Sequence, residues 1–321
     1  MMPGLFRAAA AASALTLVGA CAHQSALSPL APARAAADSS ARAAIASERT
    51  LDASQLPERS VGVAPLAVAP ADSALAPLGY GLADLLLTDL SRSSQLQVVD
   101  RIRVNALLQE LRLAGTGRVD SSTAPRVGKL IGARRIVNGA LASTREGNIA
   151  VDTRIADAAQ GTLAPGAITE ESRLGGILDA EKDIAFKLFT QLGVTLTPAE
   201  HAAVEQRPTR YLAAFLAYSN GVRAEALGDL ALAHAWYARA VLIDPSFALA
   251  RKRMDETAGS SGASGVQLGS IGPAMLSGVV DALNPSPAGT LGTIRDPGDI
   301  NERATFESGQ LGTIIIQIFT P

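Results

Sequence analysis

Cysteine, histidine and aromatic residues are all scarce in this chain of 321 residues. There is one cysteine, Cys21, there are three histidines, and Phe, Tyr and Trp together make up 4% of the sequence. A single cysteine excludes an intramolecular disulfide and a cysteine-rich zinc site. So few aromatic residues also argue against an aromatic-lined cofactor pocket. We therefore expect no bound metal or cofactor.

Charge is low as well. Lys and Arg number 28 against 30 Asp and Glu, so the net charge is −2, and charged residues make up 18% of the chain against a usual figure of about 25%. No basic surface suited to nucleic acid is expected. The apolar residues, mostly alanine, predict small aliphatic cores. The length allows two domains of roughly 150 residues each.

The first 20 residues have the pattern of a secretory signal peptide. Arg7 precedes an apolar run over residues 8–17, and small residues stand before Cys21. The run is too short for a transmembrane helix, which needs about 20 apolar residues. The segment resembles a bacterial lipoprotein signal, which implies cleavage after Ala20 and acylation of Cys21. Ala22 after the cysteine resembles the pattern for delivery to the outer membrane, so we expect a lipid anchor on its periplasmic face. The alternative is an ordinary signal peptide with an incidental cysteine.

Residues 21–59 are rich in Ala, Ser and Pro and predict a tether. A flexible segment of about 38 residues spans roughly 30 to 40 Å. An alanine-rich helix over residues 36–48 would shorten that reach.

Residues 60–196 predict an α/β (α+β) domain, a mixed sheet flanked by helices. Apolar alternation or short apolar runs indicate strands, and apolar residues at helical spacing indicate helices. The expected strands are 60–68, 96–100, 135–142, 149–157 and 161–168; the expected helices cover 82–90, 104–111, 121–131 and 177–192.

Several polar residues of this domain invite a functional interpretation, but a structural one is preferred. Asp84 and Asp89 are expected on the solvated side of a helix, and Asp100 with Arg101 at a helix start, where capping is their expected role. Three glycines are expected to allow turns and close packing: Gly128, Gly132 and Gly139. No phosphate-binding loop is present around Lys129.

The same region resembles the CsgG-like and TolB N-terminal-like domains of bacterial lipoproteins. The blocks that carry the resemblance follow the family's order: Ser60–Leu66, Leu82–Leu90, Val98–Arg101, Leu107–Leu111, Gly117–Asp120, Gly128–Arg134 and Ile136–Gly139. The resemblance covers residues 60–194. It implies the fold more specifically than the function, because members range from the curli secretion channel to accessory and scaffolding lipoproteins.

A channel subunit like that of curli secretion is the second functional hypothesis. The resemblance implies two additional membrane hairpins per channel subunit. Only the segments 134–142 and 149–157 have a length near the 9 to 11 residues of a membrane strand. Using them in a membrane would leave too few strands for the domain's own sheet. We therefore prefer a domain held at the membrane by lipid.

Residues 197–257 resemble a single tetratricopeptide repeat. Counting from Gly221, small, aromatic and proline residues stand at the expected spacing, at Ala233, Tyr237, Ala240 and Pro245. The helices would cover residues 209–227 and 230–242. One repeat cannot bury its own faces. Its aromatic residues Trp236 and Tyr237 are therefore candidates for contact with a partner, although core positions are the commoner role, and His234 is expected at the surface.

Residues 258–321 form a Gly-rich, low-complexity tail. The motif Leu-Gly-Ser/Thr-Ile recurs at residues 268–271, 291–294 and 311–314. Residues 311–319 predict a terminal strand that needs a covering edge, on its own domain or on a partner. Its partner-binding candidates are Ile314, Ile316 and Ile318.

The sequence therefore predicts a non-catalytic lipoprotein of the outer membrane that acts as an assembly, scaffold or transport-accessory component. Its partners are the membrane and an unidentified periplasmic or outer-membrane protein, with a second copy of the chain as another candidate. A hydrolase is the third hypothesis. It lacks support because no Gly-x-Ser-x-Gly motif on a strand-to-helix turn is present and only His201 and His234 fall in the folded part.

Overall fold

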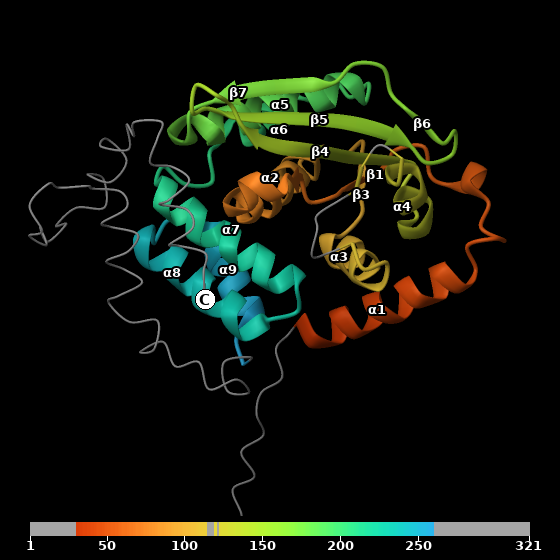
Figure 1. Ribbon diagram of the computed structural model, residues 1–321, viewed down its shortest axis with the longest axis horizontal. Helices are drawn as coiled ribbons and strands as arrows, with labels where there is room; N and C mark the ends of the chain where they lie inside the picture. Colours follow the sequence, from red (N-terminus) through yellow and green to blue (C-terminus); the bar gives the residue numbers. More distant parts are fainter. Residues whose placement is uncertain (1–29, 114–118, 121, 260–321) are drawn as a thin grey trace, which may run out of the picture.

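The computed structural model describes residues 30–113, 119–120 and 122–259. Figure 1 shows a sheet with helices on both faces and a bundle of C-terminal helices beyond one helical layer. The longer helices are α1 (Leu30–Ala46), α2 (Ala76–Leu90), α3 (Arg101–Glu110), α4 (Ala124–Ile131), α5 (Ile177–Gln191), α6 (Pro198–Glu205), α7 (Leu212–Ala226), α8 (Leu230–Ile243) and α9 (Ala248–Thr257). The same described residues contain three short 3-10 helices, η1 (Ala53–Gln55), η2 (Pro70–Leu75) and η3 (Leu174–Gly176).

Seven strands in the described part of the chain form one mixed sheet. They are β1 (Ser60–Val63), β2 (Ala67–Val68), β3 (Gln97–Val98), β4 (Arg135–Ser143), β5 (Ile149–Asp157), β6 (Thr162–Leu163) and β7 (Ile168–Ser172). The order is β3-β1-β4-β5-β6, with β2 beside β4 and β7 beside β5. Strand β1 runs parallel to β3 and β4, whereas β4 and β5 form an antiparallel hairpin paired from Arg135↔Asp157 to Ser143↔Ile149. The predicted mixed sheet flanked by helices is confirmed.

Three expected strands are wrong in their extent. The expected strand 96–100 is reduced to β3 (Gln97–Val98), because Asp100 already caps the following helix α3. The expected strand 60–68 is interrupted after Val63, because Pro65 has no N–H to donate to the ladder and the Leu66 N–H donates instead to the Gly79 carbonyl. The expected strand 161–168 is replaced by β6 and β7. Gly166 lies between them with a φ of +87°, a left-handed conformation that ends an extended strand.

The two faces of the sheet carry different helices. Alternation along β4 and β5 sends Val137 and Ile155 into a core with α2 and α5, and sends Ile136 and Ala156 into a second core with α3 and α4. The first core continues past α2 into α7 and α8. Helix α2 is therefore a layer between the sheet and the C-terminal helices, as Figure 1 shows.

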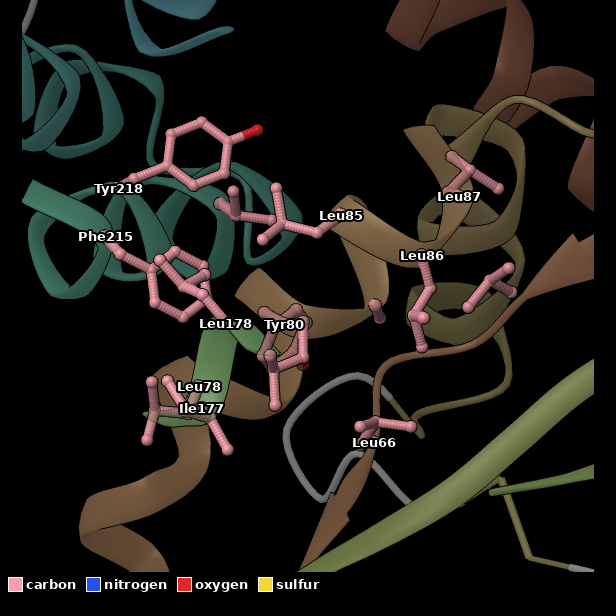
Figure 2. Packing of buried hydrophobic residues seen from close by; sticks show 14 of the residues in the cluster. Leu66, Leu78, Tyr80, Leu85, Leu86, Leu87, Ile177, Leu178, Phe215 and Tyr218 are labelled. Carbon is pink, nitrogen blue, oxygen red and sulfur yellow. The ribbon is translucent and has the colours of Figure 1, made fainter. Parts of the chain in front are cut away.

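Helix α2 is buried on almost every side because of this position. In Figure 2, side chains of α2 such as Tyr80 and Leu85 lie near Phe215 and Tyr218 of α7, with Leu178 of α5 close by. A helix can be surrounded in this way when its sequence is apolar around the whole circumference. Glycine allows the neighbouring helix to come close: a Cβ on Gly81 would lie 2.0 Å from the Ser219 Oγ of α7.

The segment predicted as a tether contains helix α1. This helix packs along α3 and α4 through Ala37 and Ala41, whose small side chains let the helices approach closely. Arg126 of α4 forms an ion pair with Glu48 just after α1, with Nε 2.7 Å from Oε1. The alanine-rich helix considered from the sequence is present, begins earlier at Leu30, and is part of the folded body.

The C-terminal helices begin where the sequence indicates. Thr197 and Glu200 form a reciprocal capping box at the start of α6. Helices α7 and α8 pair around the turn at Gly228, which has a φ of +94°. Gly221 of α7 lies against the Tyr237 ring of α8, where an added Cβ would be 2.5 Å from the ring. The predicted helices 209–227 and 230–242 are thus present, each slightly different in extent.

We expect Gly81→Ala to destabilise the chain, because the added Cβ would also lie 2.7 Å from the Ser219 Cβ and force α2 away from α7. Overpacking of this kind costs about 1 to 3 kcal/mol, measured as the free energy of unfolding in urea. Gly175→Ala is the matched control, since no atom lies within 4 Å of its added Cβ. Ser219→Gly should partly restore the Gly81→Ala protein. Equal stability of Gly81→Ala and wild type would contradict this account of the α2–α7 contact.

Candidate functional site at the junction of the sheet and the C-terminal helices

Six polar side chains meet in the interior between α2, α3 and the C-terminal helices. Their positions in the sequence span residues 84 to 253, and we call them the junction network: Asp84, Arg101, Tyr218, Glu225, Tyr237 and Arg253. The side chains of Asp84 and Glu225 are 2% and 1% exposed, and that of Arg101 is 7% exposed. Buried charges of this kind require partners.

Arg101 lies between two carboxylates. Its Nε is 3.1 Å from Asp84 Oδ1, and its Nη2 donates to Glu225 Oε1 at 2.6 Å. Arg253 adds a second cation, with Nη2 donating to Asp84 Oδ1 at 3.2 Å. Two cations and two carboxylates therefore neutralise one another inside the protein.

Two tyrosine hydroxyl groups also donate hydrogen bonds to the carboxylates. The Tyr237 hydroxyl donates to Glu225 Oε2 at 2.7 Å, and the Tyr218 hydroxyl donates to Asp84 Oδ2. Both rings are fully buried. The junction network thus joins α2 and α3, which pack on the sheet, to α7, α8 and α9.

The pKa values follow from these contacts. Burial alone would raise the pKa of Asp84, but the guanidinium groups of Arg253 and Arg101 hold that pKa below its ordinary value. Burial raises the pKa of both tyrosines, and the neighbouring carboxylates of Asp84 and Glu225 raise them further. Both phenols therefore stay protonated and remain hydrogen-bond donors.

The C-terminus of α7 is held from outside the junction network. Arg34 of α1 donates from Nη1 to the Glu225 carbonyl at 2.6 Å, and Gln109 of α3 donates to the Ala226 carbonyl. Both carbonyls belong to the last turn of α7, where carbonyl groups carry partial negative charge. The Glu225 carbonyl also accepts from the Gly228 N–H at 3.0 Å. Helix α1 is thereby connected to the C-terminal helices as well as to α3.

A small cavity lies beside the junction network at the carboxyl end of β1. It is lined by Val63, Pro65, Tyr80, Ala83, Asp84, Leu87, Arg101, Asn105 and Val222. Among the described residues, Arg101 Nη1 has no hydrogen-bond partner. The guanidinium edge and the Asn105 amide could hold a small polar group or a water molecule. The described lining contains no serine, cysteine or histidine.

A second buried cluster lies between α2 and α5. Lys182 Nζ is 2.5 Å from Asp89 Oδ2 and 3.3 Å from Glu181 Oε2, so two carboxyl groups share one ammonium group. Burial raises the pKa of Glu181 well above its ordinary value, and the nearby Asp89 carboxylate raises it further. Burial also raises the pKa of Asp89, although Lys182 opposes this change.

Two expectations from the sequence are corrected by these clusters. Asp84 and Asp89 do not lie on a solvated helix face; their exposed fractions are 3% and 4%. The physical reason is that α7 and α9 cover one side of α2 while α5 covers another. Asp100 does cap α3, with its carboxylate accepting from the Ile102 N–H at 2.7 Å, but Arg101 belongs to the junction network.

The residues singled out as partner contacts have separate locations. Trp236 is partly buried on α8, and Tyr237 points into the core, where its hydroxyl is used by Glu225. His234 is half-buried rather than exposed, since its Nδ1 lies 3.0 Å from the Met254 carbonyl oxygen. Four further candidates lie outside the described residues: Cys21, Ile314, Ile316 and Ile318.

Sequence reasoning missed five of the nine residues in the two clusters. The missed residues are Tyr218, Glu225, Arg253, Glu181 and Lys182. A signal was available in α2, whose charged residues are Asp84 and Asp89 alone, and in α7, whose charged residues are Arg223 and Glu225 alone. Within the described residues, no group of three or more His, Cys, Asp or Glu side chains is arranged to hold a metal ion.

We expect Arg101→Leu to destabilise the chain by about 3 to 5 kcal/mol, because it leaves Asp84 and Glu225 buried with too little positive charge. Urea unfolding measures the change. Arg210→Leu is the control, since Arg210 is exposed and such surface changes usually stay within about 0.5 kcal/mol. Adding Glu225→Leu to Arg101→Leu should recover part of the loss. An Arg101→Leu protein as stable as the control would show that the network does not hold the junction.

We also expect the stability of the folded chain to fall as pH rises, because of the buried carboxyl group of Glu181. Its folded-state pKa is above its unfolded value, so its contribution is complete below the unfolded pKa and is lost as pH rises through the folded pKa. The melting temperature of Glu181→Gln should fall less than that of wild type between about pH 5 and about pH 9. Glu205→Gln, at an exposed site, is the control. Parallel curves for wild type and Glu181→Gln would refute the assignment.

Comparison with known proteins supports one of the resemblances. Residues 61–162 match the family model described as "Curli production assembly/transport component CsgG". The match runs from β1 to the first residue of β6 and covers about a third of the chain. No curated protein matches the chain. The CsgG-like resemblance is therefore confirmed for this region, while the TolB-like and tetratricopeptide resemblances stay predictions.

Proposed function

We propose that this protein is a non-catalytic lipoprotein on the periplasmic face of the outer membrane that acts in assembly or transport through protein contacts. The observation that carries the proposal is the match of residues 61–162 to a family of assembly and transport components. Proteins of that family are associated with the outer membrane. The matched region is the core of the sheet domain.

The chemistry of the junction supports a structural role for its charged groups. Asp84, Glu225, Arg101 and Arg253 are bound to one another and to two tyrosines. Catalytic acids and bases need access to a substrate and a pKa near the working pH. Asp84 has neither, since it is buried and its pKa is lowered. These groups instead suit the task of holding helices in one arrangement.

The anchor in this proposal is a lipid on Cys21. The cysteine follows a short apolar run and small residues, a pattern that resembles a lipoprotein signal. Several acyl chains hold a protein firmly to a bilayer, whereas one chain does so only weakly. No helix among residues 30–113 and 122–259 has both the length and the apolar character to cross a membrane.

A channel role receives less support from the described strands. Strands β4 and β5, the longest, pair with each other over nine residues, and β1, β2, β6 and β7 occupy their other edges. Both strands also supply side chains to the two cores. Their backbone and their apolar faces are thus used inside the domain.

The partner contacts in this proposal are the exposed part of the C-terminal helices around Trp236 and the terminal segment with Ile314, Ile316 and Ile318. The partner is a periplasmic or outer-membrane protein, or a second copy of the chain. Tyr237 contributes by supporting α8 from the core, through its bond to Glu225.

We expect Cys21→Ser to release the chain from the outer membrane and to abolish incorporation of radioactive palmitate. In a strain that lacks the gene, wild type should restore the proteins lost from the outer membrane or cell surface. Cys21→Ser should not restore them, although its periplasmic level is normal. Ser54→Ala, an exposed change within the described chain, is the control.

Two results would contradict the proposal. If the Cys21→Ser chain still fractionated with the outer membrane and still carried palmitate label, Cys21 would not be the anchor. Ion conductance by the purified full-length chain in planar bilayers would favour the channel over the scaffold.

A further inference from the structure

The folded body begins close to the proposed lipid site. Helix α1 starts at Leu30, nine residues after Cys21. Nine residues span at most about 30 Å when fully extended, and a flexible segment of that length spans roughly 15 to 18 Å on average. The start of α1 must therefore stay near any bilayer that holds Cys21. This reach is much shorter than the span expected for a tether of residues 21–59.

The start of α1 lies beside the turn that joins α7 to α8. Arg34, one helical turn after Leu30, donates to the Glu225 carbonyl at 2.6 Å. A Cβ built on Gly228, in the turn itself, would lie 3.5 Å from the Arg34 guanidinium. Figure 1 shows this end of α1 next to the C-terminal helices, on the side of the molecule away from the sheet. The turn is therefore held at the same short distance from the lipid site.

Two exposed leucines flank this turn. Leu227 is 42% exposed and Leu232 is 37% exposed. The large apolar side chains exposed to this degree in the described part of the chain are these two and Leu242. Leu242 is 69% exposed but lies ten residues further along α8, about 15 Å away along the helix axis.

We propose that the α7–α8 turn rests on the bilayer surface, with Leu227 and Leu232 in contact with lipid. The proposal rests on the lipidation of Cys21, because two leucines alone cannot hold a protein at a membrane. The anchor supplies a high local concentration of the turn at the surface, and exposed leucines beside a bilayer enter the boundary between headgroups and acyl chains. The sheet then faces away from this membrane, toward the periplasm.

The test uses the full-length lipoprotein in vesicles of phosphatidylethanolamine and phosphatidylglycerol. Acylation consumes the sulfur of Cys21, the sole cysteine, so a second cysteine becomes the unique reactive thiol. Leu227→Cys, Leu232→Cys and the matched control Leu242→Cys are each labelled with a nitroxide. Power-saturation electron paramagnetic resonance then compares collisions with oxygen, which concentrates in lipid, and with a water-soluble nickel complex. Unchanged melting temperatures check that each variant is folded.

We expect the ratio of oxygen to nickel collisions to be several-fold higher at Leu227→Cys and Leu232→Cys than at Leu242→Cys. A chain that sediments with the vesicles but has equal ratios at all three sites overturns this inference and leaves the anchor intact. A chain that does not sediment with the vesicles and carries no acyl group overturns both the anchor and the inference.

Discussion

The arrangement of this protein depends on the pairing of charges that have been removed from water. Asp84 and Arg101 belong to the helices of the sheet domain, and Glu225 and Arg253 belong to the C-terminal helices. An isolated buried charge is costly, and its removal from a pair leaves the partner uncompensated. Each part of the fold therefore supplies the counter-ions of the other. An apolar interface would tolerate several orientations of the helices, whereas hydrogen bonds from arginine and tyrosine to two carboxylates require one.

Helix α2 is the element on which both halves are built. It packs on the sheet on one side and on α7 on the other, and Gly79 and Gly81 let the chain approach on each side. A Cβ on Gly79 would be 2.4 Å from the Leu66 carbonyl, just as one on Gly81 would meet Ser219. The sheet domain and the C-terminal helices share one continuous core as a result. A partner that contacts α8 is thus connected through packed side chains to the sheet.

The shared core of the sheet domain and the C-terminal helices bears on the proposed function. Helix α1 extends the same body toward the lipid site proposed at Cys21, because it packs on α3 and its Arg34 holds the last turn of α7. In the proposed arrangement, the start of α1 near the membrane, the C-terminal helices and the sheet form one packed unit. Such a unit can present its surfaces to other proteins at a set height above a bilayer.

The sequence by itself determined most of the local structure. Alternation placed β5 over Ile149–Asp157, Thr197 and Glu200 marked the start of α6, and the blocks around β1 to β4 indicated the CsgG-like domain that the family comparison supports. These features depend on neighbours within a few residues. The predicted extents of β1 and β7 were wrong because Pro65 and Gly166 interrupt the predicted strands.

Only the tertiary structure decided three other features: the burial of Asp84 and Asp89, the junction network, and the position of α1 against α3 and α4. Tyr218 and Asp84 are 134 residues apart, and Arg101 and Glu225 are 124 apart. Helical spacing shows which side of a helix is polar, but whether water or a counter-ion meets that side depends on which distant element packs there.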